Sequence, residues 1–110
     1  MDELRILIWE ELKRLFPANA EVTQQPPGNL VVMWKLNNDP ERPNRRTRPI
    51  SIRFDQHLIQ LISNETEQEK RRVARGIARI VNTGLHQGYD PNSKETSGYV
   101  IHVDDRATDR

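Results

Sequence analysis

The stretch that decides the fold is residues 65–86, ETEQEKRRVARGIARIVNTGLH. Its apolar residues, including Val73 and Ile77, recur at the spacing that places them on one side of a helix, and its arginines fall on the opposite side. Thr66 and Glu69 have the spacing of a capping box, which favours a helix start at this point. A helix with one apolar stripe needs a surface to cover that stripe, and the rest of the chain must supply it.

A second amphipathic helix is predicted over residues 2–16. Leu4, Ile8 and Leu12 lie on one side of it, whereas its charged residues gather on the other side. Pro17 cannot continue a helix, so we expect the helix to end at this proline. The chain therefore has two helices that must bury an apolar face.

Alternating apolar residues predict the strands of a sheet that these helices can cover. The strand patterns cover residues 20–25, 30–36, 50–54 and 98–103. The 30–36 strand has apolar residues on both faces, which is typical of a central strand or of a strand whose second face meets a partner. Residues 55–62 fit either a short helix capped by Asp55 or, less well, a further strand.

These elements predict an α+β fold. We expect a small antiparallel sheet of three to four strands with two main helices packed on one face, in the order α-β-β-β-(α)-α-β. Residues 1–103 would form a single domain, residues 37–49 an exposed loop rich in proline and arginine, and residues 104–110 a flexible C-terminal tail.

The composition excludes several classes of chemistry. The 110 residues include no cysteine, which rules out disulfides, thiolate zinc sites, iron–sulfur clusters and a cysteine nucleophile. No apolar run reaches the roughly 20 residues of a membrane span, and the N-terminus lacks the pattern of a signal peptide. We therefore expect a cytoplasmic protein that does not contact membranes.

No catalytic, metal-binding or cofactor-binding motif stands out. The three histidines His57, His86 and His102 do not have the spacing of a local metal pair. The serines lack a nucleophile-elbow context, and no glycine-rich phosphate loop is present. We therefore predict no catalytic residue, no metal and no cofactor, while an enzyme whose site cannot be read from the sequence remains an open alternative.

Arginine is the strongest feature outside the predicted core. The candidate binding residues are Arg42, Arg45, Arg46 and Arg48 in the loop and Arg71, Arg72, Arg75 and Arg79 on the long helix. Guanidinium groups at this density suit the phosphates of a nucleic acid. The competing interpretation is a solvated helix face that pairs with its own carboxylates, such as Glu67 with Arg71, and the net charge of +1 favours it.

The order α-β-β-β-α is similar to that of double-stranded RNA-binding domains, which also place basic residues near the start of their second helix. The basic run Lys70-Arg71-Arg72-Val73-Ala74-Arg75 carries this resemblance. The chain departs from it in its acidic helix start, its long proline-rich loop and its final strand. The resemblance implies RNA binding through the arginines, and it concerns element order alone.

The leading functional hypothesis is a non-catalytic protein that binds another macromolecule or itself. The apolar residues on both faces of the 30–36 strand and the extended proline- and arginine-rich loop motivate it. The expected partner is a second copy, as a homodimer, or another protein. The alternative is RNA or another nucleic acid, bound by the arginines of the long helix and of residues 42–48.

Overall fold

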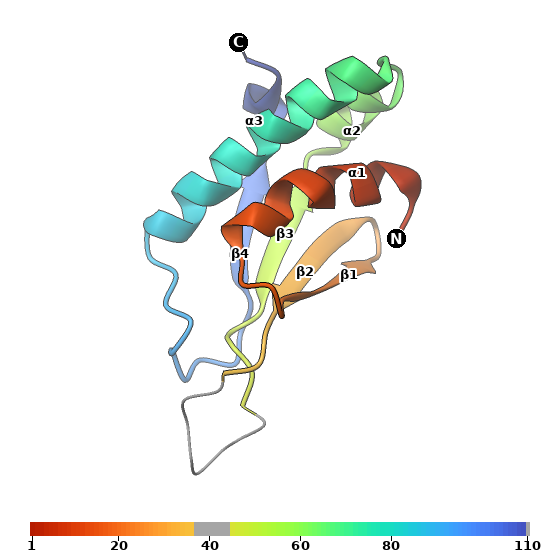
Figure 1. Ribbon diagram of the computed structural model, residues 1–110. Helices are drawn as coiled ribbons and strands as arrows, with labels where there is room; N and C mark the ends of the chain where they lie inside the picture. The colour runs from red at the N-terminus through yellow and green to blue at the C-terminus, as the bar shows by residue number, and fades with distance from the viewer. Residues whose placement is uncertain (37–44, 110) are drawn as a thin grey trace.

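In the structure, which is a computed structural model describing residues 1–36 and 45–109, helices lie across one face of a four-stranded sheet (Figure 1). The helices are α1 (Glu3–Leu12), α2 (Gln56–Ser63) and α3 (Glu67–His86), with short 3-10 helices η1 (Lys13–Leu15) and η2 (Asp105–Thr108). The strands are β1 (Glu21–Gln25), β2 (Asn29–Met33), β3 (Ile50–Phe54) and β4 (Tyr99–Val103). The predicted α+β class and element order are confirmed.

The sheet is mixed, which corrects the expectation of a wholly antiparallel sheet. Its strand order is β1-β2-β3-β4, and the first two pairs of neighbours are antiparallel. β4 instead runs parallel to β3, with Tyr99 opposite Ile50 and Val103 opposite Phe54. Helices α2 and α3 carry the chain back along the sheet before β4 begins, so β4 starts at the same end as β3.

Side-chain caps fix where the helices begin. Asp55 accepts a hydrogen bond of 2.9 Å from the N–H of His57, so the ambiguous 55–62 segment is a helix. Thr66 accepts a hydrogen bond of 3.2 Å from the N–H of Glu69, as the capping-box spacing predicts. The Thr66 cap starts α3 as a helix separate from α2.

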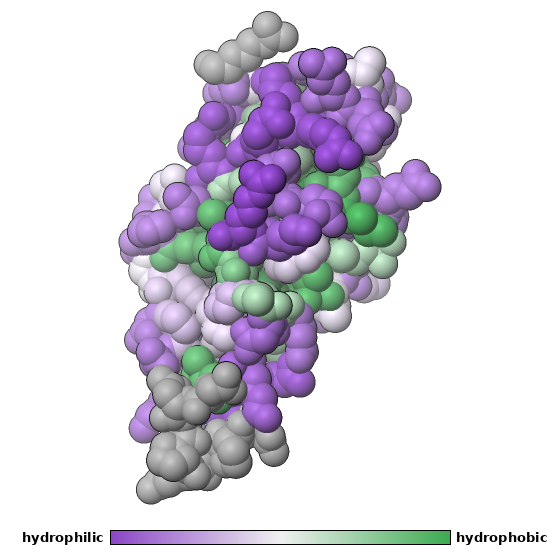
Figure 2. Space-filling model, viewed as in Figure 1, coloured by the Kyte–Doolittle hydropathy of each residue, from purple (hydrophilic) through white to green (hydrophobic). Residues whose placement is uncertain are grey.

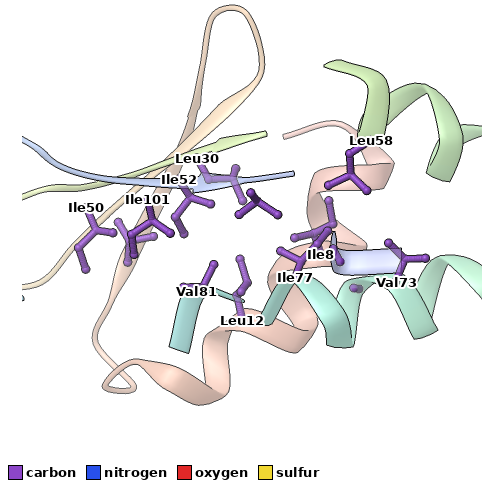
Figure 3. Packing of buried hydrophobic residues seen from close by; sticks show 14 of the residues in the cluster. Ile8, Leu12, Leu30, Ile50, Ile52, Leu58, Val73, Ile77, Val81 and Ile101 are labelled. Atoms are coloured by element: carbon purple, nitrogen blue, oxygen red, sulfur yellow. The ribbon is translucent and has the colours of Figure 1, made fainter. Parts of the chain in front are cut away.

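One hydrophobic cluster lies between the helices and the sheet (Figure 3). Ile8 and Leu12 of α1 and Leu58 of α2 are completely buried in it. From α3, the residues buried in the cluster are Val73, Ala74, Ile77 and Val81. The opposite side of α3, with Arg71, Arg75 and Arg79, is exposed, and Figure 2 shows hydrophilic side chains over this helix. The predicted orientation of α3 is therefore correct.

The C-terminal segment differs from the polar tail that the sequence led us to expect. It forms η2, and Ala107 in its middle is only 1% exposed. The backbone of η2 packs directly on Gly76 of α3, and there is no room between them for a side chain on residue 76. Ala107 is a single small apolar residue in a polar stretch, so sequence pattern alone could not reveal this packing.

The loop predicted over residues 37–49 lies partly outside the described residues, which resume at Arg45. Residues 45–49 are not simply exposed, because Thr47 is only 3% exposed and its N–H donates to the carbonyl of Trp34 at 2.8 Å. The hydroxyl of Thr47 accepts in turn from the N–H of Trp34 at 3.1 Å. This part of the loop therefore extends the β2–β3 pairing beyond the strand ends, with a bridge between Lys35 and Arg46.

Candidate binding surface

The last strand of the sheet has one free edge. β4 pairs with β3 on one side and with no other strand among the described residues. None of its five residues is charged lysine, arginine, aspartate or glutamate, and tyrosine, valine and isoleucine are residues that favour strands. The edge thus lacks the lysine, proline or bulge by which proteins commonly block further pairing.

The free edge presents the backbone groups of Val100 and His102. The N–H of Tyr99 donates to the carbonyl of Pro49 at 2.7 Å, and the carbonyl of Val103 accepts from Asp55 at 2.8 Å. Backbone groups alternate in direction along a strand, so the odd-numbered residues of β4 face β3. The N–H and carbonyl groups of Val100 and His102 consequently point outward.

Helix α3 passes directly above this edge strand. An added Cβ at Gly84 would lie 3.1 Å from the side chain of Ile101, and the hydroxyl of Tyr99 donates to the carbonyl of Gly84 at 2.7 Å. A helix is about 10–12 Å across, whereas neighbouring strands are about 4.8 Å apart. A helix centred over an edge strand therefore extends beyond that strand by about the width of one further strand.

A groove of about 520 Å³ lies where α3 extends past β4. Its lining comes from α3 (Arg79, Ile80, Thr83, Gly84 and Gln87), from β4 (Tyr99, Val100, Ile101 and His102), and from Arg106 and Asp109. Ile80 and Ile101 give it apolar surface, whereas Arg79 lies at the end next to the C-terminal segment, where it reaches the carbonyl of Asp109 at 3.4 Å. The groove thus combines an open strand edge, apolar surface and positive charge at a single end.

The two arginines of the groove differ in the partners that the described residues give them. Arg106 pairs with Asp104 at 2.9 Å, and this contact lowers the pKa of the Asp104 carboxyl. Within residues 1–36 and 45–109, Arg79 makes one hydrogen bond, of 3.4 Å, to the backbone carbonyl of Asp109. Because Arg79 is exposed and has no carboxylate partner among the described residues, it is available to an anionic group.

Aromatic side chains support the strand from the core side of the sheet. Trp34 packs against Tyr89, and Tyr89 packs against Tyr99, with ring centroids 6.2 and 5.3 Å apart. The hydroxyl of Tyr89 donates to the carbonyl of Arg48 at 2.7 Å, and burial raises the pKa of this tyrosine. These contacts hold Tyr99, the first residue of β4, which lines the groove.

The loop arginines of the sequence prediction hold the chain together instead of forming a free patch. Arg42 lies outside the described residues. Arg45 donates to the backbone carbonyls of Asn92 and Ser93. Arg48 pairs with Glu95 at 3.1 Å and stacks over the ring of Tyr99, and Arg46 pairs with Glu21 of β1.

Two of the four helix arginines, Arg71 and Arg72, pair along α3 itself. Arg71 pairs with Glu67 at 3.0 Å, as the four-residue spacing predicts. Arg72 makes two hydrogen bonds to the carboxylate of Glu69 and a third, of 3.1 Å, to the carbonyl of Thr108. Arg75 is exposed and has no hydrogen bond or ion pair with the described residues. Of the predicted binding residues that the structure describes, only Arg79 lines the groove.

Sequence reasoning missed most of the groove. Thr83, Gln87, Val100 and Arg106 carried no motif, and the spacing of the histidines gave His102 no predicted role. The uncharged, β-branched composition of residues 99–103 was visible in the sequence, but the position of this strand at the sheet edge was not.

The described residues show no metal-binding cluster. Residues 1–36 and 45–109 contain no cluster of histidine and acidic side chains with metal-site geometry. His102 lines the groove together with Asp109, but no hydrogen bond joins them in this part of the chain. None of the described helices has the length and apolar character needed to cross a membrane.

Comparisons of the chain with protein-family models, curated proteins and solved structures gave no match.

Proposed function

We propose that this protein acts by binding another protein, without chemistry of its own, in the groove between α3 and β4. The observation that carries the proposal is the free edge of β4 beneath the overhanging α3. An uncharged strand edge with outward backbone groups is costly to leave uncovered, because it invites pairing with other chains. A partner in the groove would satisfy these groups.

The groove has the composition of a recognition site. Ile80 and Ile101 give it apolar surface, and Thr83, Gln87 and two arginines give it polar side chains. Apolar surface supplies binding energy, whereas a few placed polar groups supply orientation. Its lining follows α3 from Arg79 to Gln87 and β4 from Tyr99 to His102, an extent that suits a chain segment better than a small molecule that must be enclosed.

Selection from a displayed library of random peptides of about ten residues, long enough to form a strand, would test this proposal. The enriched peptides would be synthesised and titrated into the ¹⁵N-labelled protein. We expect the largest amide shifts at Val100, His102 and the α3 residues that line the groove. Failure to enrich any peptide, or shifts centred on another surface, would contradict the proposed function.

A charge reversal provides the matched control. Arg79→Glu would place a carboxylate in the groove, whereas Arg75→Glu makes the same change one helical turn away, on a residue outside the groove lining. We expect Arg79→Glu to weaken binding by about tenfold or more, the effect of one charged contact, and Arg75→Glu to leave it nearly unchanged. Equal effects of both changes would indicate general electrostatic attraction instead of a site.

Nucleic-acid binding has less support as an alternative function. Its strongest candidates, Arg71 and Arg72, are paired with Glu67 and Glu69 of the same helix. The predicted alternative remains testable, because phosphate binding falls steeply with salt. Binding of RNA at about 50 mM salt that is lost in the combined Arg71→Ala and Arg72→Ala variant would favour it. A cytoplasmic location also remains a prediction.

A further inference from the structure

We infer that the groove receives an extended segment of a partner protein, which pairs with β4 as a fifth strand and carries a carboxylate toward Arg79. This inference rests on the proposed function and specifies its binding mode. Three features carry it: the direction of the β4 backbone groups, the overhang of α3, and the charge at one end of the groove.

The backbone of β4 favours an extended occupant. Val100 and His102 direct their N–H and carbonyl groups into the open side, which follows from the hydrogen bonds of Tyr99 and Val103 with the β3 side. An extended segment can satisfy both residues at once with its own backbone. A helix offers no free backbone groups along its side, so it would leave these donors and acceptors without partners.

The part of α3 that extends past β4 would cover one face of this fifth strand. The side chain of Ile80 is only half-buried, and it lines the groove together with Ile101 of β4. Alternate residues of an added strand would point toward α3, where apolar side chains can contact these two isoleucines. We therefore expect apolar residues at every second position of the bound segment.

The same overhang argues against a second copy of β4 as the occupant. Antiparallel pairing of β4 with its copy would place the two strands about 4.8 Å apart across a twofold axis near Ile101. α3 lies directly above Ile101, at Gly84, so the two α3 helices would meet at that axis. Packed helices need about 8–10 Å between their axes, and the copies would therefore collide.

The positive charge of the groove favours an acidic residue in the bound segment. Arg79 and Arg106 line one end of the groove, and Arg79 has no carboxylate partner in the described chain. Asp109 also lines this end and offsets part of the positive charge. A single carboxylate of the segment can meet the fork of Arg79, whereas a lysine or arginine there would be repelled.

N-methylation of the enriched peptides tests the binding mode. Methyl groups on alternate amides of a β-strand face the same edge. We expect one alternating set of methylated amides to weaken binding by about tenfold or more, and the other set to leave it nearly unchanged. If the peptides bind in the groove but both sets weaken binding equally, the fifth-strand inference is wrong while the proposed function stands.

Changes in β4 test the same contact from the other side. Val100→Pro removes an outward N–H that an edge strand does not use within the sheet, and Val100→Thr retains that N–H with a similar shape. We expect Val100→Pro to weaken peptide binding by about tenfold and Val100→Thr to have little effect. If Val100→Pro fails to fold, the methylated peptides still decide the question with the unaltered protein.

Peptide sequence and oligomeric state complete the test. Peptides enriched on the unaltered protein should carry an aspartate or glutamate, and peptides enriched on Arg79→Glu should not. Enrichment without any preference for acidic residues would overturn the role of Arg79. A dimer seen by sedimentation that Val100→Pro dissociates would overturn the inference in favour of a second copy.

Discussion

Gly76 of α3 and Ala107 of η2 are in such close contact that a Cβ on Gly76 would lie 2.0 Å from the carbonyl oxygen of Ala107. This approach joins the C-terminal segment to the long helix. The carbonyl belongs to the backbone, so it cannot move aside as the end of a flexible side chain could. Gly76 is therefore present for packing and not as a weak point of the helix.

Gly76→Ala should destabilise the protein although alanine is the better helix former. Alanine improves helix propensity by about 1 kcal/mol, but the clash with Ala107 must displace η2. We expect a net loss of about 2–3 kcal/mol in the free energy of unfolding, measured by urea denaturation.

Removal of residues 104–110 provides the matched background for this change. Without η2 the clash is absent, so Gly76→Ala should become neutral or stabilising in the shortened chain. The same loss in both backgrounds would show that the Gly76–Ala107 contact is not its cause.

Arg5 of α1 should be a structural residue, unlike Arg14 of η1. It is only 9% exposed, its Nε donates to the carbonyl of Gly28 at 3.0 Å, and it lies over the ring of Phe54. Arg5→Met keeps much of the side-chain length but leaves the carbonyl without this donor. We expect a loss of about 1–3 kcal/mol, measured by thermal or urea unfolding.

Arg14→Met is the control for Arg5, because the Arg14 side chain is 73% exposed. We expect it to change stability by less than about 0.5 kcal/mol. Similar losses for the two substitutions would mean that the contact between Arg5 and Gly28 contributes little.

Stability should fall in acid partly through Asp2. Partial burial alone would raise the pKa of Asp2, but hydrogen bonds from Arg5 and Gln24 and the charge of Arg5 together lower it below 3.8. A carboxyl with a lowered pKa stabilises the folded chain above its unfolded pKa, and this contribution disappears as the pH falls through the folded pKa.

Asp2→Asn isolates this charge, because asparagine also caps helices. We expect the unaltered protein to be more stable by less than about 1 kcal/mol near neutral pH, since Asp2 is half-exposed. Urea unfolding across a pH series should show the difference shrinking below pH 3.8. A difference that stays constant down to the most acidic pH would contradict this assignment.

Amide hydrogen exchange should alternate along β4. The N–H groups of Tyr99, Ile101 and Val103 face β3, whereas those of Val100 and His102 face the open edge. We expect the outward amides to exchange about a hundredfold faster, which corresponds to a difference of about 3 kcal/mol in opening free energy. Uniform protection of all five amides would mean that another chain already covers the edge.

Local features of the fold could be predicted from the sequence because nearby residues determine them. The cap of Thr66, the pairing of Glu67 with Arg71 and the buried stripe of α3 each depend on residues within a few positions of one another. Such contacts are fixed once the helix forms.

Features that depend on distant segments could not be predicted in the same way. The parallel direction of β4 depends on how α2 and α3 return the chain, and the burial of Ala107 depends on a glycine 31 positions earlier, Gly76. The arginines show the same division. The partner of Arg71 was predictable from spacing, whereas the carbonyl of Thr108 that meets Arg72 was not.

The parallel pairing of β3 with β4 also has a consequence for folding during synthesis, because it determines when β4 can pair. β4 joins its neighbour only across the whole of α2 and α3, so its contacts are among the most distant in the chain and should close late. The ribosome releases Tyr99–Val103 after α3, the helix that covers this strand. The edge strand, which can pair with other chains, therefore emerges when the elements it packs against are already present. A circular permutant that begins with β4 would reverse that sequence and expose the segment to aggregation.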